Sequence, residues 1–188
     1  MSGITADLVT LDPLSGRYFQ NTQSFEEFNR IFSGPNTAIA MAIIPAAFYA
    51  VGLLRRDPYA QKTFLLAGEA VLSSEILTTV MKNTTRRLNP GDVPENGDFS
   101  ATWFKKTHGS WIRGIGSFPS GHTIAAFSIA TVFAKRYPHP RWIPYVAYSL
   151  AAVVGFSRVT LQSHFPSDVF LGGALGYAIA NMAVRRGP

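Results

Sequence analysis

The sequence contains no cysteine, which excludes disulfides, thiolate zinc sites and cysteine nucleophiles. Charged residues are also scarce: they make up 15% of the 188 residues, whereas soluble domains contain roughly 25%. Hydrophobic residues make up 47%, and this balance excludes a disordered or low-complexity chain. The length suits a single domain. The formal net charge of +6 indicates an anionic partner, without distinguishing phosphate, nucleic acid and lipid.

Apolar runs recur along the chain with short polar breaks between them. Only the first two approach the ~20 residues that a bilayer core requires, and the other three reach that length with their polar flanks. Glu69 and Glu75 interrupt the second run, although a carboxylate at mid-membrane costs roughly 2.5–3.5 kcal/mol. We predict an all-α fold, a membrane-embedded bundle of about five long apolar helices; the alternative is a very apolar soluble bundle. The runs are Thr37–Leu54, Thr63–Met81, Thr123–Ala134, Ile143–Phe156 and Val169–Val184.

The N-terminal segment predicts one short amphipathic helix. Ser24 to Glu27 match a capping box, and Phe25, Phe28 and Phe32 would line one face of the helix that follows. This face either packs on the bundle or lies on lipid. The start of the chain lacks the features of a signal peptide. We therefore predict an N-terminal segment over residues 1–36 and a single bundle domain over residues 37–188.

Basic residues gather at alternate ends of successive runs. Arg55-Arg56, Lys135-Arg136 with Arg141, and Arg185-Arg186 share one face if each run crosses the membrane once. Short loops with Lys and Arg favour the cytoplasmic side, so we predict a multi-pass protein of a bacterial-type inner membrane. The N-terminus would then lie outside, which is consistent with a preceding span or signal that this sequence does not include. The long irregular stretch Leu88–Ser117 would lie on the periplasmic or exterior face.

Three polar clusters stand at run ends on that second face. An up-and-down bundle brings such ends together, although they are far apart in the sequence. The clusters are Lys82 with Arg86, Arg87, Asn89 and Pro90; Phe118-Pro119-Ser120-Gly121-His122-Thr123; and Ser157-Arg158 with His164 and Asp168.

These residue types suit an oxyanion. Lys82 and Arg158 are positive charges, and an arginine can hold a phosphate through two parallel hydrogen bonds. Ser120 stands where a helix begins, so its hydroxyl and the free N–H groups of the first turn can face an anion. Gly121 has no side chain and lets the backbone approach closely.

Two imidazoles accompany this anion site. His164 and Asp168 lie four residues apart at a helix start, so the carboxylate can orient one ring nitrogen and leave the other as a nucleophile. His122 is then available to protonate the leaving oxygen. Taken singly, each feature is more often a charged flank, a helix cap or a structural histidine. We assign no role to His108 or His139, which fit that description.

The combination of clusters resembles the type 2 phosphatidic acid phosphatase family, in the superfamily that includes bacterial non-specific acid phosphatases and vanadium haloperoxidases. The superfamily signature has three parts: Lys-x6-Arg-Pro, Pro-Ser-Gly-His and Ser-Arg-x5-His-x3-Asp. The second part is complete as Pro119 to His122, and the third as Ser157-Arg158 with His164 and Asp168. The resemblance extends from about Thr63 to Arg186.

The first part of the signature departs from the pattern. Lys82 and Pro90 are in place, but Asn89 occupies the position of the arginine. Arg87 stands two residues earlier, and we expect its long side chain to serve as the substitute phosphate ligand. The role of Asn89 stays uncertain.

The resemblance implies an all-helical core and phosphate hydrolysis through a phosphohistidine, without a metal or other cofactor. It implies that His164 is the nucleophile, that Asp168 orients it and that His122 is the general acid. Lys82, Ser120, Gly121 and Arg158 would hold the phosphate.

We therefore expect a phosphoric monoester or lipid diphosphate hydrolase whose partners are the membrane and a phospholipid or polyprenyl phosphate, and not nucleic acid. Phosphatidic acid, phosphatidylglycerol phosphate, undecaprenyl pyrophosphate and a lipid A phosphate are all candidate substrates. The alternatives are a soluble periplasmic non-specific acid phosphatase, a haloperoxidase that holds vanadate in the same nest, and a non-catalytic transporter or scaffold. The intact pair of His164 and Asp168 argues against the last of these.

Overall fold

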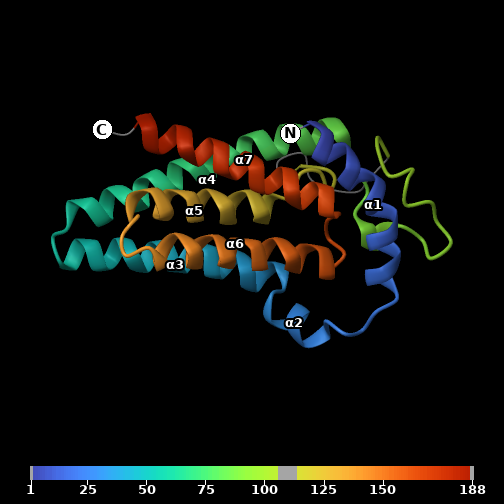
Figure 1. Cartoon of the computed structure of the whole chain (residues 1–188), viewed down its shortest axis with the longest axis horizontal. Helices are drawn as coiled ribbons and strands as arrows, with labels where there is room; N and C mark the ends of the chain where they lie inside the picture. The colour runs from blue at the N-terminus through green and yellow to red at the C-terminus, as the bar shows by residue number, and fades with distance from the viewer. Residues whose placement is uncertain (1, 106–113, 187–188) are drawn as a thin grey trace.

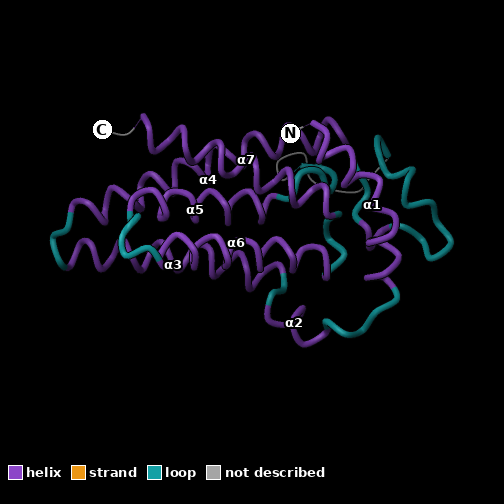
Figure 2. The backbone as a smooth tube through the Cα atoms, in the orientation of Figure 1, coloured by secondary structure: helices purple, strands orange, loops and turns teal. Residues whose placement is uncertain are grey.

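The computed structural model describes residues 2–105 and 114–186, and this part of the chain is helical with loops and no strand (Figures 1 and 2). His108 lies outside the described residues. The elements are α1 (Ser2–Gln20), α2 (Glu26–Ile31), α3 (Gly34–Leu54), α4 (Pro58–Thr85), the 3-10 turn η1 (Pro90–Asp92), α5 (Gly121–Arg136), α6 (Trp142–Thr160) and α7 (Pro166–Arg186).

Five long helices, α3 to α7, run side by side along the long axis of the molecule, and α1 crosses one end of them (Figure 1). Each of the five predicted apolar runs lies within one of these helices, so the predicted bundle is confirmed. Helix α5 is central and contacts α3, α4, α6 and α7.

The bundle places small side chains inside and large apolar side chains outside. Gly176 shows how tight the interior is, because a Cβ there would lie 2.4 Å from the carbonyl oxygen of Ile124. Close approach through small residues is typical of helices that pack within a membrane. A soluble bundle would turn its large apolar residues inward. The outward side chains include Ile39, Ile43 and Phe48 of α3, Leu65, Leu72 and Ile76 of α4, and Tyr145 and Leu150 of α6.

Four of the helices are long and apolar enough to cross a membrane: α3, α4 with its extension to Asp92, α6 and α7. Together with the outward apolar surface, they identify an integral membrane protein. Helix α5 has 16 residues, which corresponds to a length of about 24 Å, and most of its side chains are buried among its neighbours. Its short length is tolerated because protein, rather than lipid, surrounds it.

The two ends of the bundle differ in charge and in construction. The last turns of α5 and α7 and the turn after α3 carry the basic clusters, and these ends lie together on the left of Figure 1. The last turn of α4, the first turn of α5 and the α6–α7 connection lie at the opposite end, which α1 crosses (Figure 1). Asp57 caps α4 by accepting hydrogen bonds from the backbone N–H of Tyr59 and Ala60.

The N-terminal segment differs from the sequence prediction in two respects. Helix α1 was not predicted, because Pro13 and Gly16 interrupt its apolar pattern. The predicted capping box is wrong: α2 begins at Glu26, its N-cap is Phe25, and no side chain caps it. The Ser24 hydroxyl instead accepts a hydrogen bond from Thr22.

The aromatic face of α2 packs on the bundle. The rings of Phe25 and Phe28 lie 5.7 and 5.8 Å from the ring of Phe156 on α6, measured between centroids. The packing alternative is therefore the one the structure shows. The proposed boundary at residue 36 stays a prediction.

Candidate active site

The three predicted clusters meet at the end of the bundle that α1 crosses. Lys82 is in the last turn of α4, Ser120 and His122 open α5, Arg158 is in the last turn of α6, and Asp168 is in the first turn of α7. His164 lies in the short connection between α6 and α7. Neighbouring helices are antiparallel, so the C-terminal ends of α4 and α6 meet the N-terminal ends of α5 and α7 (Figure 1).

The charged groups are close enough to act on one another. Arg158, His164 and Lys82 all act electrostatically on His122, and Lys82 and Asp168 act on His164. Two cations and two imidazoles from four different elements therefore share one site. This is the arrangement that binds an oxyanion.

Hydrogen-bond acceptors from the α2–α3 junction and from the adjacent Ser157 hold the guanidinium of Arg158. Its Nη2 donates to Thr37 Oγ1 at 3.0 Å and to the carbonyl of Phe32, and its Nε donates to Ser157 Oγ at 3.1 Å. The side chain is 1% exposed. Its Nη1 has no hydrogen-bond partner among the described residues and remains free to bind a ligand.

Lys82 approaches the site along the loop that precedes α5. A Cβ at Gly114, whose φ is +79°, would lie 2.8 Å from the Cβ of Lys82, so the glycine allows the loop to pack on this side chain. Two carboxylates act on the Lys82 ammonium: Glu75, about two turns earlier on the same face of α4, and Asp168.

The start of α5 offers donors to an anion. Ser120 is its N-cap and is fully buried, and its Oγ accepts a hydrogen bond from Thr123 Oγ1 at 2.8 Å, which leaves its own proton available. The first N–H groups of the helix have no partner within it. A Cβ at Gly121 would make only ordinary contacts with Thr78 and Glu75. Packing within the protein therefore does not require this glycine, and its role would be toward a ligand.

His164 faces Asp168 but is not hydrogen-bonded to it. The distance from His164 Nδ1 to Asp168 Oδ2 is 3.8 Å, which is too long for a hydrogen bond. Nδ1 is buried and has no partner among the described residues. Burial, reinforced by the charge of Lys82, holds the pKa of His164 below its ordinary value, although Asp168 acts in the opposite direction.

His122 is tied to the N-terminal end of α3. Its Nε2 lies 3.3 Å from the carbonyl oxygen of Gly34. This contact leaves Nδ1 as the nitrogen that can face a ligand. A protonated imidazole has donors on both nitrogens, so one proton can bind Gly34 while the other is given to a leaving group.

Arg87, the expected substitute phosphate ligand, is bound to carboxylates and hydroxyls of the protein. Its Nη1 donates to Asp168 Oδ1 at 2.5 Å and to Ser167 Oγ, its Nη2 donates to Asp12 Oδ2 at 2.6 Å, and its Nε donates to Thr102. The side chain is 1% exposed. All three guanidinium nitrogens of Arg87 thus bind protein groups in this structure, and a phosphate contact by Arg87 stays a prediction.

The backbone explains this position. Helix α4 ends at Thr85, and its C-cap residue Arg86 adopts a left-handed conformation with φ of 42°. This conformation turns Arg87 away from the helix axis. Gly116 then packs directly on the backbone of Arg87. Asn89 lies further away: its side chain donates to Asp92 Oδ2 at 2.6 Å within the 3-10 turn. Arg87 and Asn89 therefore both bind acidic side chains of the protein in this structure.

Several residues that support this site could not be predicted from the sequence. Asp12 on α1 is buried and binds Arg87 and Ser167, while Thr37 and the Phe32 carbonyl bind Arg158. They lie outside the three motifs, and no local pattern marks them. Within the described residues, no group of three or more His, Asp or Glu is placed to hold a metal ion.

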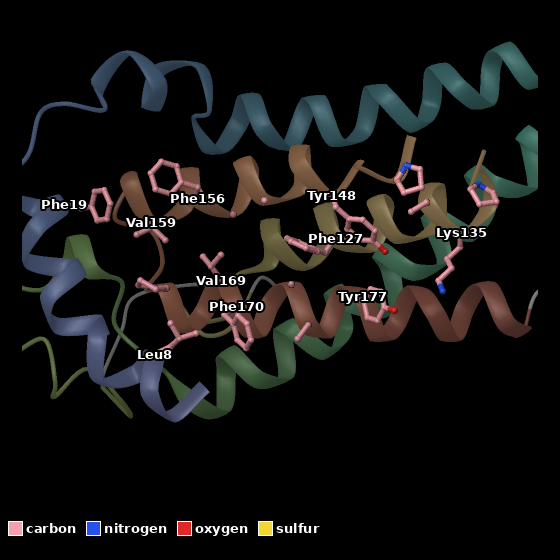
Figure 3. A pocket seen from close by; sticks show the side chains of 18 residues that line it. Leu8, Phe19, Phe127, Lys135, Tyr148, Phe156, Val159, Val169, Phe170 and Tyr177 are labelled. Carbon is pink, nitrogen blue, oxygen red and sulfur yellow. The ribbon is translucent and has the colours of Figure 1, made fainter. Parts of the chain in front are cut away.

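Two apolar grooves run along the outside of the bundle. The first, about 1180 Å³, lies over α5, α6 and α7 and is bordered by Leu8 and Phe19 of α1 (Figure 3). The second, about 750 Å³, lies between α3 and α6 with α5 as its floor. Phe32 and Thr37, which hold Arg158, line the second groove, so it leads to the phosphate site.

The fold and the site define a membrane-embedded helical bundle with a cationic, histidine-containing cluster at one end. The family model of the PAP2 superfamily matches residues 63–187, and the chain belongs to this superfamily.

Curated relatives are similar over part of their length. The chain is 34% identical over 107 residues to the lipid A 1-phosphatase of Rhizobium etli, which covers 56% of this chain and 42% of that protein. It is 40% identical over 68 residues to phosphatidylglycerophosphatase B of Bacillus subtilis, which covers 32% of this chain and 34% of that protein. The chain thus spans less than half the length of these relatives.

Solved structures share the fold. Aquifex aeolicus LpxE superposes with a TM-score of 0.63 at 21% identity, over 93% of this chain and 95% of that one. The transmembrane PAP2 type phosphatidylglycerolphosphate phosphatase from Bacillus subtilis superposes with a TM-score of 0.59 at 21% identity, over 98% of this chain and 86% of that one.

Proposed function

We propose that this protein is a lipid phosphatase that hydrolyses a phosphate monoester or pyrophosphate on a membrane lipid through a phosphohistidine at His164. The observation that carries the proposal is the meeting of Lys82, His122, Arg158 and His164 at one end of a membrane-embedded bundle. The relatives named as lipid A 1-phosphatase and phosphatidylglycerophosphatase B support a lipid substrate.

Phosphate binding uses the donors that the protein leaves unpaired. Nη1 of Arg158, the ammonium of Lys82, the hydroxyl of Ser120 and the first N–H groups of α5 surround the phosphoryl oxygens. These donors stabilise the charge that develops on those oxygens in the transition state. They supply this stabilisation from the protein's own side chains and backbone, so the proposed reaction uses no metal.

The first step transfers the phosphoryl group to His164. Its Nδ1 faces Asp168, so Nε2 attacks phosphorus: the P–N bond forms, and the bond from phosphorus to the lipid oxygen breaks. His122 gives a proton to that oxygen. In the second step His122 takes a proton from water, the water oxygen attacks phosphorus, the P–N bond breaks and inorganic phosphate leaves.

The hydrocarbon chain of the substrate lies in the groove between α3 and α6. This groove is open along the outer surface of the bundle and leads to the residues that hold Arg158, so a lipid can enter from the bilayer with its phosphate at the site. The basic clusters at the other end of the bundle favour the cytoplasm, and they support a site on the periplasmic or exterior face of the inner membrane.

The test is release of phosphate in detergent from lipid A 1-phosphate and phosphatidylglycerol phosphate, with EDTA present. The wild type should turn over and form an acid-labile phosphoenzyme that maps to His164. His164→Gln should retain less than about 1% of the activity, because no other group replaces the nucleophile. His139→Gln is the matched control, since this exposed histidine lies in the turn at the opposite end. A phosphoenzyme on another residue, or full activity of His164→Gln, would refute the mechanism.

A further inference from the structure

Asp12 is a buried carboxylate on a helix outside the region that matches the family. It is 1% exposed, although α1 carries exposed residues on either side of it, Leu11 and Leu14. Its Oδ2 accepts from Arg87 Nη2 at 2.6 Å and from the hydroxyl of Ser167, and its Oδ1 accepts from the Ser167 N–H at 3.1 Å. A carboxylate is buried in this way only when donors compensate for its lost hydration.

Arg87 is shared between two carboxylates. It donates to Asp12 from Nη2 and to Asp168 from Nη1, and all three side chains are 1% exposed or less. A single cation thus faces two anions, and the strength of its bond to Asp168 depends on the presence of Asp12. If Asp12 were neutral, the guanidinium charge would act on Asp168 alone.

Asp12 also holds the first turn of α7. Pro166 has no N–H, so Ser167 provides the first backbone donor of the helix, and Asp12 accepts it. The next residue is Asp168, whose Oδ2 accepts from the N–H of Phe165 at 2.9 Å. Oδ1 of Asp168 is thus held by Arg87 and Oδ2 by the backbone at the start of α7, and Asp12 binds both supports.

We propose that Asp12 is a positioning residue for the reaction: through Arg87 and the first turn of α7, it sets the place and the charge of Asp168 beside His164. The inference rests on the proposed function, because it assigns Asp168 the task of orienting the nucleophile. Asp12 itself makes no contact with the phosphate. A role limited to docking α1 on the bundle would affect folding and leave the electrostatics of His164 unchanged.

The experiment compares Asp12→Asn with Asp7→Asn in the full chain in detergent. Asp7 is an exposed carboxylate on the same helix, so its variant loses the same charge away from Arg87. Two quantities are measured: kcat for lipid phosphate, and the pKa of His164 from 15N spectra of histidine-labelled protein, which contains four histidines. The titration of His164 needs no turnover, so it reports on Asp12 even if the wild type proves inactive and the proposed function fails.

Asp12→Asn should lower kcat by about 10- to 100-fold, with KM within about twofold, because the loss lies in the orientation of the nucleophile. It should also lower the pKa of His164 by roughly 0.5–1 unit. The guanidinium of Arg87 then acts on Asp168 alone, so the Asp168 carboxylate stabilises the protonated imidazole less. The charges that face His164 from the packed elements, Lys82 and Asp168, are the same in both proteins. Asp7→Asn should change neither quantity.

Non-additivity completes the test. Asp12 transmits its charge to Asp168 through Arg87, whereas its link to the first turn of α7 consists of hydrogen bonds from Ser167 alone. The double variant Asp12→Asn/Arg87→Gln should therefore be slower than Arg87→Gln by no more than about fivefold. An unchanged pKa of His164 in folded Asp12→Asn would overturn the proposal. So would a double variant whose loss is the product of the two single losses.

Discussion

Replacing Arg87 by methionine should destabilise the protein strongly, and more at about pH 8 than at about pH 5. Methionine matches the length of the arginine stem but donates no hydrogen bond. It leaves Asp12 and Asp168 buried without a cation, and Ser167 and Thr102 without a donor. Breaking a buried ion pair by removing one partner typically costs about 3–5 kcal/mol. For a chain of this size, that loss corresponds to a fall in Tm of roughly 6–20 °C.

The pH dependence follows from Asp12. Burial raises the pKa of its carboxyl, while the bonds from Arg87 and Ser167 act against this rise. Without Arg87 the pKa in the folded state rises further above the unfolded value. A group of this kind stabilises the fold fully below its unfolded pKa, and the stabilisation is lost as the pH rises through the folded pKa. Acid should therefore partly restore the variant.

The assay is thermal unfolding in detergent at both pH values, with two controls. Arg17→Met removes an exposed charge from α1, and Asn89→Ala removes the side-chain hydrogen bond to Asp92. Each variant should lower the free energy of unfolding by less than about 1 kcal/mol. The same comparison applies to activity, where Arg87→Ala should be clearly worse than Asn89→Ala because Arg87 holds Asp168. If Arg87→Met unfolds like the wild type, the buried ion network does not stabilise this protein. An equal loss of stability at both pH values would instead contradict the pH dependence assigned to Asp12.

Three further outcomes are expected. His122→Ala should lower the rate of hydrolysis of alkyl phosphates by about 10²- to 10⁴-fold and that of activated aryl phosphates much less, because a good leaving group needs little protonation. An equal loss for both substrates would show that His122 is not the general acid. The profile of kcat against pH, which reports the complex with substrate, should be bell-shaped between about pH 4 and 9, since one imidazole must be neutral while the other is charged. Its acid limb should lie below about pH 6.5, because burial and Lys82 hold the pKa of His164 below its ordinary value; a flat profile, or an acid limb above that value, contradicts this. Ala147→Trp, in the groove between α3 and α6, should raise KM for a lipid phosphate about tenfold and leave KM for p-nitrophenyl phosphate unchanged. The control Ala152→Trp, on the other groove, should change KM for neither substrate. Similar effects of both variants would place the lipid chain elsewhere.

Much of the architecture is determined by the order of apolar runs and polar breaks. Each run of about 12 or more apolar residues must bury its surface in lipid or protein, and a helix is the form that satisfies its backbone inside a membrane. An up-and-down order makes successive helices antiparallel, and this order alone brings Lys82, His122, Arg158 and His164 to one end of the bundle. The motifs carry this information locally.

The tertiary structure alone decided what supports those residues. The left-handed backbone at Arg86 sends Arg87 toward Asp168, and a one-dimensional spacing cannot express such a rotation. Gly16 looks like a helix breaker, yet in α1 it makes room for Phe99, because a Cβ there would lie 2.5 Å from that ring. Asp12 reads as an ordinary surface acid until α1 is folded across the bundle, where Arg87 lies 75 positions away in the chain. Long-range partners of this kind depend on how whole helices pack, so their physical cause lies in three dimensions and not in any local pattern.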